Sequence, residues 1–425
     1  MLSKIQGVIS QSRLGFVSIL SITILIFASE AQSAELSPND TVLTRQRPEL
    51  DPLGIRMGGF LVYPKLQVGV QDNDNIFAVN TDTKSDRITL IRPVVDIKSN
   101  WSKHSLGFRA GYDLARYSDN PNEDYDDHSV GLNGRFDISG NSAFNANLML
   151  EQLHEARTSP DDIKGITPTI YTQQIVSGSF SSDSNRLSYL FDSSILRLAF
   201  DPTQTTTGAI SNDDRNRKES IATVRLGYVV SPGYQIYFQG HVNSRDYDQS
   251  TDRYGFKRSS DGYDLAIGAA LLSGVTTANI HYGYLAQFYD DNRFEKISEP
   301  IFGGELVWNP SGLDTITGRI NRQIDETTFE SASGIRVTQY DAAIDHELRR
   351  YLILHAGISR RQEDYQGIDR KDAVTALNIG AKYMMNRHFY VVFIYEYERR
   401  ESEPFLDGIY NYRINKYTLN ISAQI

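Results

Sequence analysis

The sequence has no cysteine and only 2 tryptophans among its 425 residues, whereas tyrosine (25) and phenylalanine (19) are abundant. Without cysteine there is no disulfide bond, no thiolate metal site and no cysteine nucleophile. This absence is compatible with an exported protein, because a large sheet structure needs no covalent staple.

Long apolar runs and excess positive charge are also missing. Past the N-terminal region no stretch of about 18 apolar residues occurs, which disfavours a membrane protein built from helices. The mean hydropathy is -0.40 and the formal net charge is -10. Non-specific nucleic-acid binding relies on a basic surface, so we expect no nucleic-acid partner.

The N-terminus has the features of an export signal. Lys4 and Arg13 precede the apolar stretch "LGFVSILSITILIFA", and small residues follow in "SEAQSAE". Ala31 and Ser33 suit the −3 and −1 positions of a signal-peptidase site, which predicts cleavage near residue 33, with cleavage after Ala34 as a variant. A single transmembrane anchor is the alternative, although the apolar run is short for a span.

From Gly58 onward, apolar and polar residues alternate with a period of two, and no amphipathic helix is evident. In "HSLGFRAGYDLARY", for example, Leu106 and Phe108 share one face, whereas Arg109 and Asp113 lie on the other. This alternation is typical of β-strands with one apolar and one wet face.

Short turn sequences and long polar loops alternate between these segments. The short turns are "NWSKH", "SGNSA", "SDSNR", "VSPGY", "LSGVT", "NPSG", "LRRY" and "MNRH". The pattern predicts an antiparallel up-and-down meander of about eighteen strands, each about 14 to 17 residues long.

An all-β transmembrane barrel of the outer-membrane type accounts for this meander. Only a closed barrel satisfies every backbone polar group in lipid, and an even strand number is usual in bacterial barrels. Strands longer than a bilayer requires would extend the wall above the membrane. A soluble sandwich or propeller is the alternative, but it does not explain the uncharged apolar faces or the unequal loop lengths.

The predicted organisation is a signal peptide (1–34), a periplasmic N-terminal segment (35–57) and a barrel (58–425). The tight turns and both chain ends would face the periplasm of a Gram-negative cell. The expected partners are outer-membrane lipid and the barrel-insertion machinery. The C-terminal "YTLNISAQI" resembles the insertion signal of such barrels, although it ends in Ile425 where phenylalanine is usual.

Charged residues on the wet faces are the candidate functional residues, because an arginine in the middle of the bilayer would cost roughly 2 to 4 kcal/mol. We expect them to line the lumen and to set the field that a permeating solute meets, unless they only brace the interior in pairs. Two tyrosines on the same faces would offer stacking surfaces to sugar rings, whereas the outward tyrosines and phenylalanines would form the interfacial girdle. The candidates are Arg92, Arg109, Asp113, Tyr117, Arg225, Tyr237, Arg319, Arg322, Asp345, Glu347, Arg349, Arg361, Glu396 and Glu398.

The stretch "QDNDNIF" at residues 71–77 suggests a cation loop at first sight. An EF-hand loop that began at Asp72 would place Ile76 and Phe77 at positions five and six, where an oxygen ligand and a glycine are required. The motif therefore fails, and solvated loop residues are the preferred interpretation. A looser Ca²⁺ site remains as an alternative. Its ligands would be Asp72 and Asp74 with Glu123 or Asp126.

No catalytic, cofactor or metal site is expected. The eight histidines are scattered, and neither HExxH nor G-x-S-x-G occurs. A triad assembled from separate strands is the one enzymatic alternative that sequence does not exclude.

Residues 45–130 resemble the outer-membrane β-barrel porins of the second BBP type, a family similar to the EpsL proteins of exopolysaccharide operons. The matching residues include Arg47-Pro48, Asp51-Pro52, Tyr63-Pro64, Asp74-Asn75-Ile76, Lys84-Ser85-Asp86, Trp101-Ser102 and Glu123-Asp124-Tyr125. The resemblance implies an outer-membrane barrel, often associated with polysaccharide export, and supplies no catalytic residues.

The function expected from sequence is a passive conduit or accessory porin for exopolysaccharide export. The polysaccharide and periplasmic export proteins would then be partners. The alternatives are a general diffusion porin for small solutes and a structural or adhesive barrel whose loops bind.

Overall fold

The computed structural model describes residues 41–404 and 410–425. All of the long elements in these residues are β-strands. The wall strands are β2 (Phe60–Asn73), β3 (Asp86–Ser99), β4 (Ser105–Tyr117), β5 (Tyr125–Ser139), β6 (Ser142–His154), β7 (Ile170–Ser184), β8 (Leu187–Phe200), β11 (Arg217–Ser231), β12 (Tyr234–Tyr247), β13 (Ser260–Ser273), β14 (Thr276–Tyr289), β15 (Ile297–Ser311), β16 (Asp314–Asp325), β17 (Ile335–Arg349), β18 (Leu352–Tyr365), β19 (Lys371–Met384), β20 (Phe389–Glu403) and β21 (Tyr412–Gln424). The short elements are β1 (Ile55–Met57), β9 (Thr203–Thr205), β10 (Gly208–Ile210) and the 3₁₀ turns η1 (Pro121–Glu123) and η2 (Asp213–Arg215).

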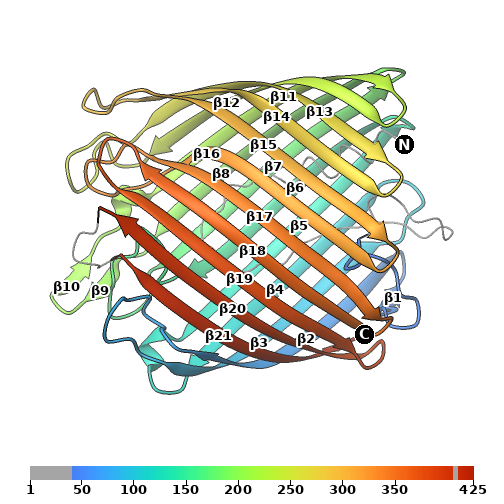
Figure 1. The fold of residues 1–425 in the computed structure, drawn as a ribbon, viewed down its shortest axis with the longest axis horizontal. Helices are drawn as coiled ribbons and strands as arrows, with labels where there is room; N and C mark the ends of the chain where they lie inside the picture. Colours follow the sequence, from blue (N-terminus) through green and yellow to red (C-terminus); the bar gives the residue numbers. More distant parts are fainter. Residues whose placement is uncertain (1–40, 405–409) are drawn as a thin grey trace.

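The eighteen wall strands form one closed antiparallel barrel (Figure 1). Each strand pairs with its neighbours in sequence, and β21 pairs with β2 to close the sheet. The prediction of an up-and-down barrel of about eighteen strands is confirmed. The strands are 12 to 15 residues long, slightly shorter than predicted, because residues beside the turns leave the ladder. No helix among the described residues is long and apolar enough to cross a membrane. The predicted signal peptide lies outside the described residues.

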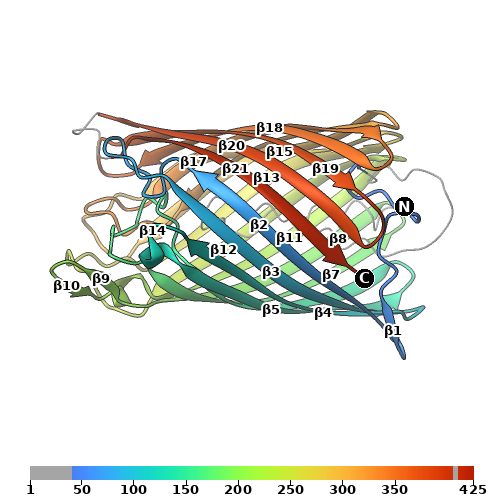
Figure 2. The same ribbon diagram turned by 90° about the horizontal axis from the view of Figure 1, so that it is seen from below.

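The tight turns all lie at one end of the barrel and the long loops at the other (Figures 1 and 2). The C-terminus and β1 lie at the tight-turn end, and the β9–β10 hairpin lies at the opposite end. In outer-membrane barrels the short turns face the periplasm, so the long loops form the outer mouth. β1 pairs with Phe60–Val62 of β2, below the point where β21 begins to pair, and so covers the free edge of β2.

The two faces of the wall differ in polarity as the alternation predicts. On β12, Ile236 and Phe238 point outward and are about half exposed, whereas Gln235 and Gln239 on the inner face are buried. Leu66 and Val68 of β2 are likewise exposed on the outside. The buried apolar residues do not form one central core. They form small clusters along the wall and under the loops instead.

The "QDNDNIF" stretch is less solvated than expected. Asp72 is exposed, but Asn73 is the last residue of β2 and is buried. Asn75 is 1% exposed, and its side-chain amide donates to the carbonyls of Val79 and Arg413. These asparagines organise the turn out of the wall, because an asparagine side chain can satisfy backbone groups that leave the ladder.

Candidate functional site: the charged inner wall and the outer mouth

The pairing register places most of the predicted charged residues on the inner face of the barrel. They lie on the side of each strand opposite the exposed apolar residues, as an alternation with a period of two requires. The inner-face residues among the candidates are Arg92, Arg109, Asp113, Tyr117, Arg225, Tyr237, Arg319, Asp345, Glu347, Arg361, Glu396 and Glu398.

Two predicted lumen residues lie elsewhere. Arg322 is three residues from Arg319 in β16, which pairs with β17 without a bulge, so the two arginines face opposite sides. Arg322 lies on the outer face, donates to Thr338 Oγ1 at 3.0 Å and lies over the ring of Phe302. Placing it in the lumen was wrong, because an odd spacing changes the face. Arg349 lies beside the β17–β18 turn after a bulge and is exposed there.

Inner-wall cations pair with acids on neighbouring strands. Arg92 Nε lies 2.8 Å from Asp113 Oδ1, and Arg109 Nη1 lies 3.1 Å from an oxygen of Asp96. Both pairs are roughly three-quarters buried. In each pair the arginine and the acid neutralise each other across the β3–β4 ladder. These residues therefore stabilise the wall and present only part of their charge to the lumen.

Arg319 is the exception among these pairs. Its Nη2 lies 2.6 Å from Glu305 Oε1, yet its side chain is 50% exposed. In contrast, Arg361 is 13% exposed and is held by both Asp325 and Glu363. Arg319 is therefore the predicted residue best placed to act on a passing ion.

The two predicted stacking tyrosines are packed into the wall. Tyr237 is 5% exposed, its hydroxyl donates to Asn279 Oδ1, and Arg225 lies over its ring at 4.3 Å. Tyr117 packs against a buried cluster that includes Ile88 and Leu90. The expectation that these rings offer stacking faces to sugars is not supported, because neighbouring side chains cover Tyr237 and Tyr117 is partly buried against its cluster.

The inner acids also have specific neighbours. Asp345 Oδ1 lies 2.7 Å from His355 Nδ1, and Tyr412 donates its hydroxyl proton to Glu398 Oε1 at 2.5 Å. Glu396 lies directly opposite Lys416 in the β20–β21 register.

The N-terminal segment contributes an interaction that sequence reasoning missed. Arg47 donates to Glu347 Oε2 at 2.6 Å, and the backbone N–H of Val42 donates to Thr315 Oγ1 at 2.8 Å. Val42 is fully buried in a cluster that includes Ile353. The segment before β1 is therefore docked on the inner wall near its periplasmic end. The segment has no periodicity, so no sequence signal pointed to this contact.

Lys65 and Lys382 form a second feature that sequence reasoning missed. Both ammonium groups lie over the ring of Tyr390, at 6.0 and 4.7 Å from its centroid, on the periplasmic part of the inner wall. Among the described residues neither ammonium is found in an ion pair with a carboxylate. The two cations are therefore available to attract an anionic solute, because no bound acid neutralises them.

The loop between β6 and β7, residues 155–169, is tied to the neighbouring outer loops by buried ion pairs. Arg157 forms a two-point pair with Glu123 of the β4–β5 loop. Arg215 of the β8–β11 loop forms another with Glu155. Burial alone would lower the pKa of Arg157, but its pairs with Glu123 and Asp162 raise it above the ordinary value. Such paired, planar contacts hold a loop in one position.

The same loop reaches across the outer mouth. Thr327, in the β16–β17 loop, donates from Oγ1 to Asp161 Oδ1 at 2.8 Å. Eight wall strands separate the two loops on one side and ten on the other, so this hydrogen bond joins opposite sides of the barrel. Burial raises the pKa of Asp161, although nearby Arg215 opposes that shift. We call residues 155–169 the crossing loop.

The β16–β17 loop is itself held by a buried arginine. Arg258, from the β12–β13 loop, pairs with Asp252 at 2.7 Å and donates to the carbonyl oxygens of Thr327 and Phe329. Arg258 is almost fully buried, so it holds the β16–β17 loop in place. The ion pairs of Arg157 and Arg215 hold the crossing loop, and both loops that meet across the mouth are therefore fixed.

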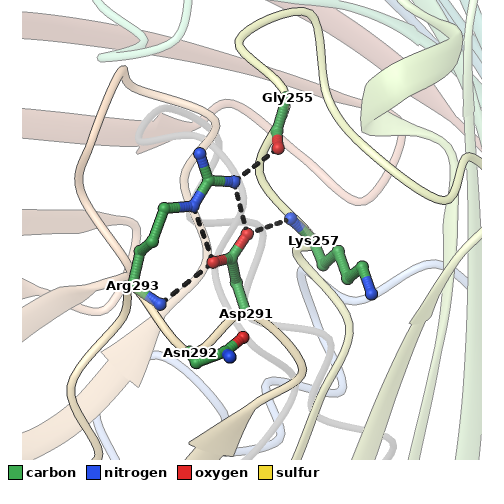
Figure 3. A pocket seen from close by; sticks show the side chains of 5 residues that line it. All are labelled: Gly255, Lys257, Asp291, Asn292 and Arg293. Carbon is green, nitrogen blue, oxygen red and sulfur yellow. Dashed lines mark hydrogen bonds and ion pairs between the residues drawn. The ribbon is translucent and has the colours of Figure 1, made fainter.

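A pocket of about 480 Å³ lies between the β12–β13 and β14–β15 loops (Figure 3). Asp291 pairs with Arg293 at 2.6 Å and accepts a hydrogen bond from the backbone N–H of Lys257 at 2.8 Å. The bond from Arg293 holds the pKa of Asp291 well below its ordinary value. Asp291 and Arg293 neutralise each other, and Arg293 also donates to the carbonyl oxygen of Gly255, so these contacts tie the two loops together.

The alternative Ca²⁺ site is not assembled. Asp72 pairs with Arg87, and Asp74 accepts two hydrogen bonds from Asn415. Glu123 is committed to Arg157, and Asp126 to Arg116. Within residues 41–404 and 410–425, no group of three or more histidines or acids is arranged to hold a metal ion.

Comparison with known families decides the identity of this charged, closed barrel. The sequence model of the family described as "Putative beta-barrel porin 2" matches residues 47–425. The chain belongs to this family. It is thus an outer-membrane porin by family, and porins are generally not enzymes. The resemblance to EpsL proteins has no support from the comparisons.

Solved porin structures resemble this porin at low sequence identity. Pseudomonas aeruginosa OpdL is 10% identical with a TM-score of 0.44, and 87% of this chain and 99% of OpdL are covered. A BenF-like porin from Pseudomonas fluorescens Pf-5 is 9% identical with a TM-score of 0.47 and the same coverage. Acinetobacter baumannii OccAB4 is 12% identical with a TM-score of 0.46, again covering 87% and 99%. No curated protein matches the sequence.

Proposed function

We propose that this porin is a passive diffusion pore for small solutes in the outer membrane. The observation that carries the proposal is the hydrogen bond between Asp161 and Thr327, which joins loops from opposite sides of the outer mouth. A polymer chain needs a continuous wide passage, whereas a mouth divided by a crossing loop still admits small molecules.

The charges of the inner wall support the same function. Many of them are paired with acids on the same strand or on strands one or two places away, which leaves a polar surface of low net field. Arg319 is half exposed, and Lys65 and Lys382 lie near Tyr390 without an ion pair. In this proposal these three cations tune a weak preference for anions, because Lys65 and Lys382 have no acid partner and the exposed Arg319 is only partly neutralised by Glu305.

Two other functions remain as rivals. Export of exopolysaccharide, which the sequence resemblance favoured, would require polysaccharide and periplasmic export proteins as partners, and it would require the crossing loop to move aside. A structural or adhesive role would rest on the outer loops alone. In all three functions we propose outer-membrane lipid and the barrel-insertion machinery as partners.

Deletion of the gene in its own cell distinguishes the three. A diffusion pore predicts unchanged surface polysaccharide with slower entry of small solutes. Loss of surface polysaccharide with unchanged solute entry would support export instead. Loss of adhesion alone would support the structural role. Complementation with the intact gene must restore the phenotype.

A further inference from the structure

Outward-facing cations gather on one side of the barrel. Each of the six consecutive strands from β16 to β21 carries one lysine or arginine on its outer face, toward the outer end of the strand. They are Arg322, Arg336, Arg360, Lys371, Arg399 and Arg413. The described strands β5–β7 and β12–β15 carry no outward lysine or arginine. Other outward cations lie on β3, β4, β8 and β11, at Arg87, Arg116, Arg197 and Lys218, so what distinguishes this side is an unbroken run of six strands.

Three of these arginines lie in one row. In the pairing register Arg360 lies opposite Thr375, Thr375 opposite Arg399, and Arg399 opposite Arg413. All three arginines are exposed. Directly opposed residues have their Cβ atoms about 5 Å apart, and like charges at that distance destabilise a sheet. Arg399 and Arg413 lie directly opposite each other in this row, so an anion that bound both of them would relieve their repulsion. We call Arg360, Arg399 and Arg413 the arginine row.

The protein itself neutralises this row only in part. Arg399 pairs with Glu401 on its own strand at 2.7 Å, and Arg360 donates to Thr375 Oγ1 at 3.3 Å. No ion pair is found for Arg360 or Arg413 among the described residues.

The next row outward holds Gln362, Ala373 and Glu401, and its one acid pairs with Arg399. The row beyond that one is different. Its members alternate in sign along the register and cancel one another. They are Arg336, Asp364, Lys371 and Glu403. The unbalanced charge is therefore confined to the arginine row.

Aromatic residues fix the depth of the row. One step toward the membrane on the same face lie Tyr397 and Asn415, and the next step holds the ring pair Tyr395–Tyr417, whose centroids are 5.0 Å apart. Tyr417 is about half exposed. Outward tyrosines mark the level of the lipid headgroups, so the arginine row lies at or just above the headgroup level of the outer leaflet.

We propose that the arginine row binds the phosphate groups of a phosphorylated glycolipid in the outer leaflet. Guanidinium groups bind phosphate through paired hydrogen bonds, and the row offers three of them on one exposed surface. The row crosses four strands, so it extends over about 14 Å and has room for more than one phosphate. This surface faces lipid and is independent of what passes through the lumen.

The test measures binding of bis-phosphorylated lipid A, and of the same lipid without phosphate, to the purified full-length barrel by native mass spectrometry. The row variant carries Arg360→Gln, Arg399→Gln and Arg413→Gln. A matched control carries Arg87→Gln, Arg197→Gln and Lys218→Gln, which remove the same charge from outward positions on other strands. We expect the row variant to bind phosphorylated lipid A roughly a hundredfold more weakly, at about fivefold per cation, and the control to bind like the wild type.

Three outcomes would overturn the proposal: binding by the row variant within twofold of the wild type, an equal loss in the control, or no preference of the wild type for the phosphorylated lipid. Heat-modifiable gel mobility checks that each variant is folded. If the triple variant does not fold, the single Arg413→Gln variant is expected to bind about fivefold more weakly, and unchanged binding contradicts the proposal equally.

Discussion

At the residue scale, Arg319 and Arg361 show how similar side chains on the inner wall differ in effect. Both pair with acids, but Arg319 is 50% exposed and Arg361 only 13%. Arg319→Gln should shift the permeability ratio of the pore toward cations severalfold, because it removes a charge that a passing ion meets. Reversal potentials in a salt gradient across a planar bilayer measure this shift.

Arg361→Gln is the matched variant. It leaves two acids, Asp325 and Glu363, without their shared partner, so it should lower stability more than it changes selectivity. Equal selectivity shifts in both variants would contradict this assignment.

Gly233 provides a second test at this scale. In the β11–β12 turn it has φ of +83°, and an added Cβ would lie 2.3 Å from the carbonyl oxygen of Leu272. Gly233→Ala should therefore destabilise the barrel by about 1 to 3 kcal/mol, measured by urea unfolding in detergent. Gly140, in the β5–β6 turn, has open space around its Cβ position. Gly140→Ala should leave the free energy of unfolding almost unchanged. An equal loss of stability in the Gly233→Ala and Gly140→Ala variants would contradict this explanation.

Sequence alternation predicts most of the inner-wall residues but not their partners. Arg92 and Arg109 could be assigned to the wet face from their neighbours alone, whereas the error at Arg322 came from ignoring its odd spacing from Arg319. The contact between Arg47 and Glu347 joins residues 300 positions apart. No local pattern encodes such a contact, because it depends on the closure of the barrel.

At the element scale, the crossing loop controls the width of the outer mouth in this account. Thr327→Val removes the hydroxyl that donates to Asp161 but keeps the shape of the side chain. Single-channel conductance should rise, because the loop loses its anchor on the far side. Thr207→Val, in the exposed β9–β10 hairpin, removes a hydroxyl that bonds only locally and should leave conductance unchanged. No difference between the two variants would contradict the role of the crossing loop.

The buried carboxyl of Asp161 predicts a pH dependence of the same loop. Burial raises its pKa in the docked state, with Arg215, Glu155 and Arg217 as its charged neighbours. A raised pKa means that protonation favours docking, so docking is strongest below the ordinary aspartate pKa and weakens as the pH rises through the raised pKa. Conductance should therefore fall on acidification from neutral pH. In the Asp161→Asn variant this fall in conductance on acidification should disappear. If the variant keeps the pH profile of the wild type, Asp161 is not the group responsible.

The positions of the turns and loops follow from the sequence, but the contacts between loops do not. Glycine, proline or asparagine occurs in seven of the eight tight turns, since these residues permit the required backbone angles, whereas "LRRY" contains none of them. The crossing loop carries charged residues that look like ordinary solvated side chains in sequence. Only the structure pairs Arg157 with Glu123 and Arg215 with Glu155.

At the scale of the whole molecule, the closed barrel follows from alternation together with the need to satisfy backbone groups in lipid. The docking of the N-terminal segment could not be predicted, because its contacts with Thr315 and Glu347 exist only once the wall has closed. The inferred function is the point on which the sequence and the structure differ most. The resemblance favoured polymer export, whereas the crossing loop favours small solutes.

The most direct test of this function is a swelling assay on liposomes that contain the purified barrel, with sugars of increasing size as external solutes. The account predicts fast entry of monosaccharides, a steep fall with size, and a faster rate for larger sugars in the Thr327→Val variant. Absence of any solute entry, or entry of long oligosaccharides as fast as monosaccharides, would contradict it.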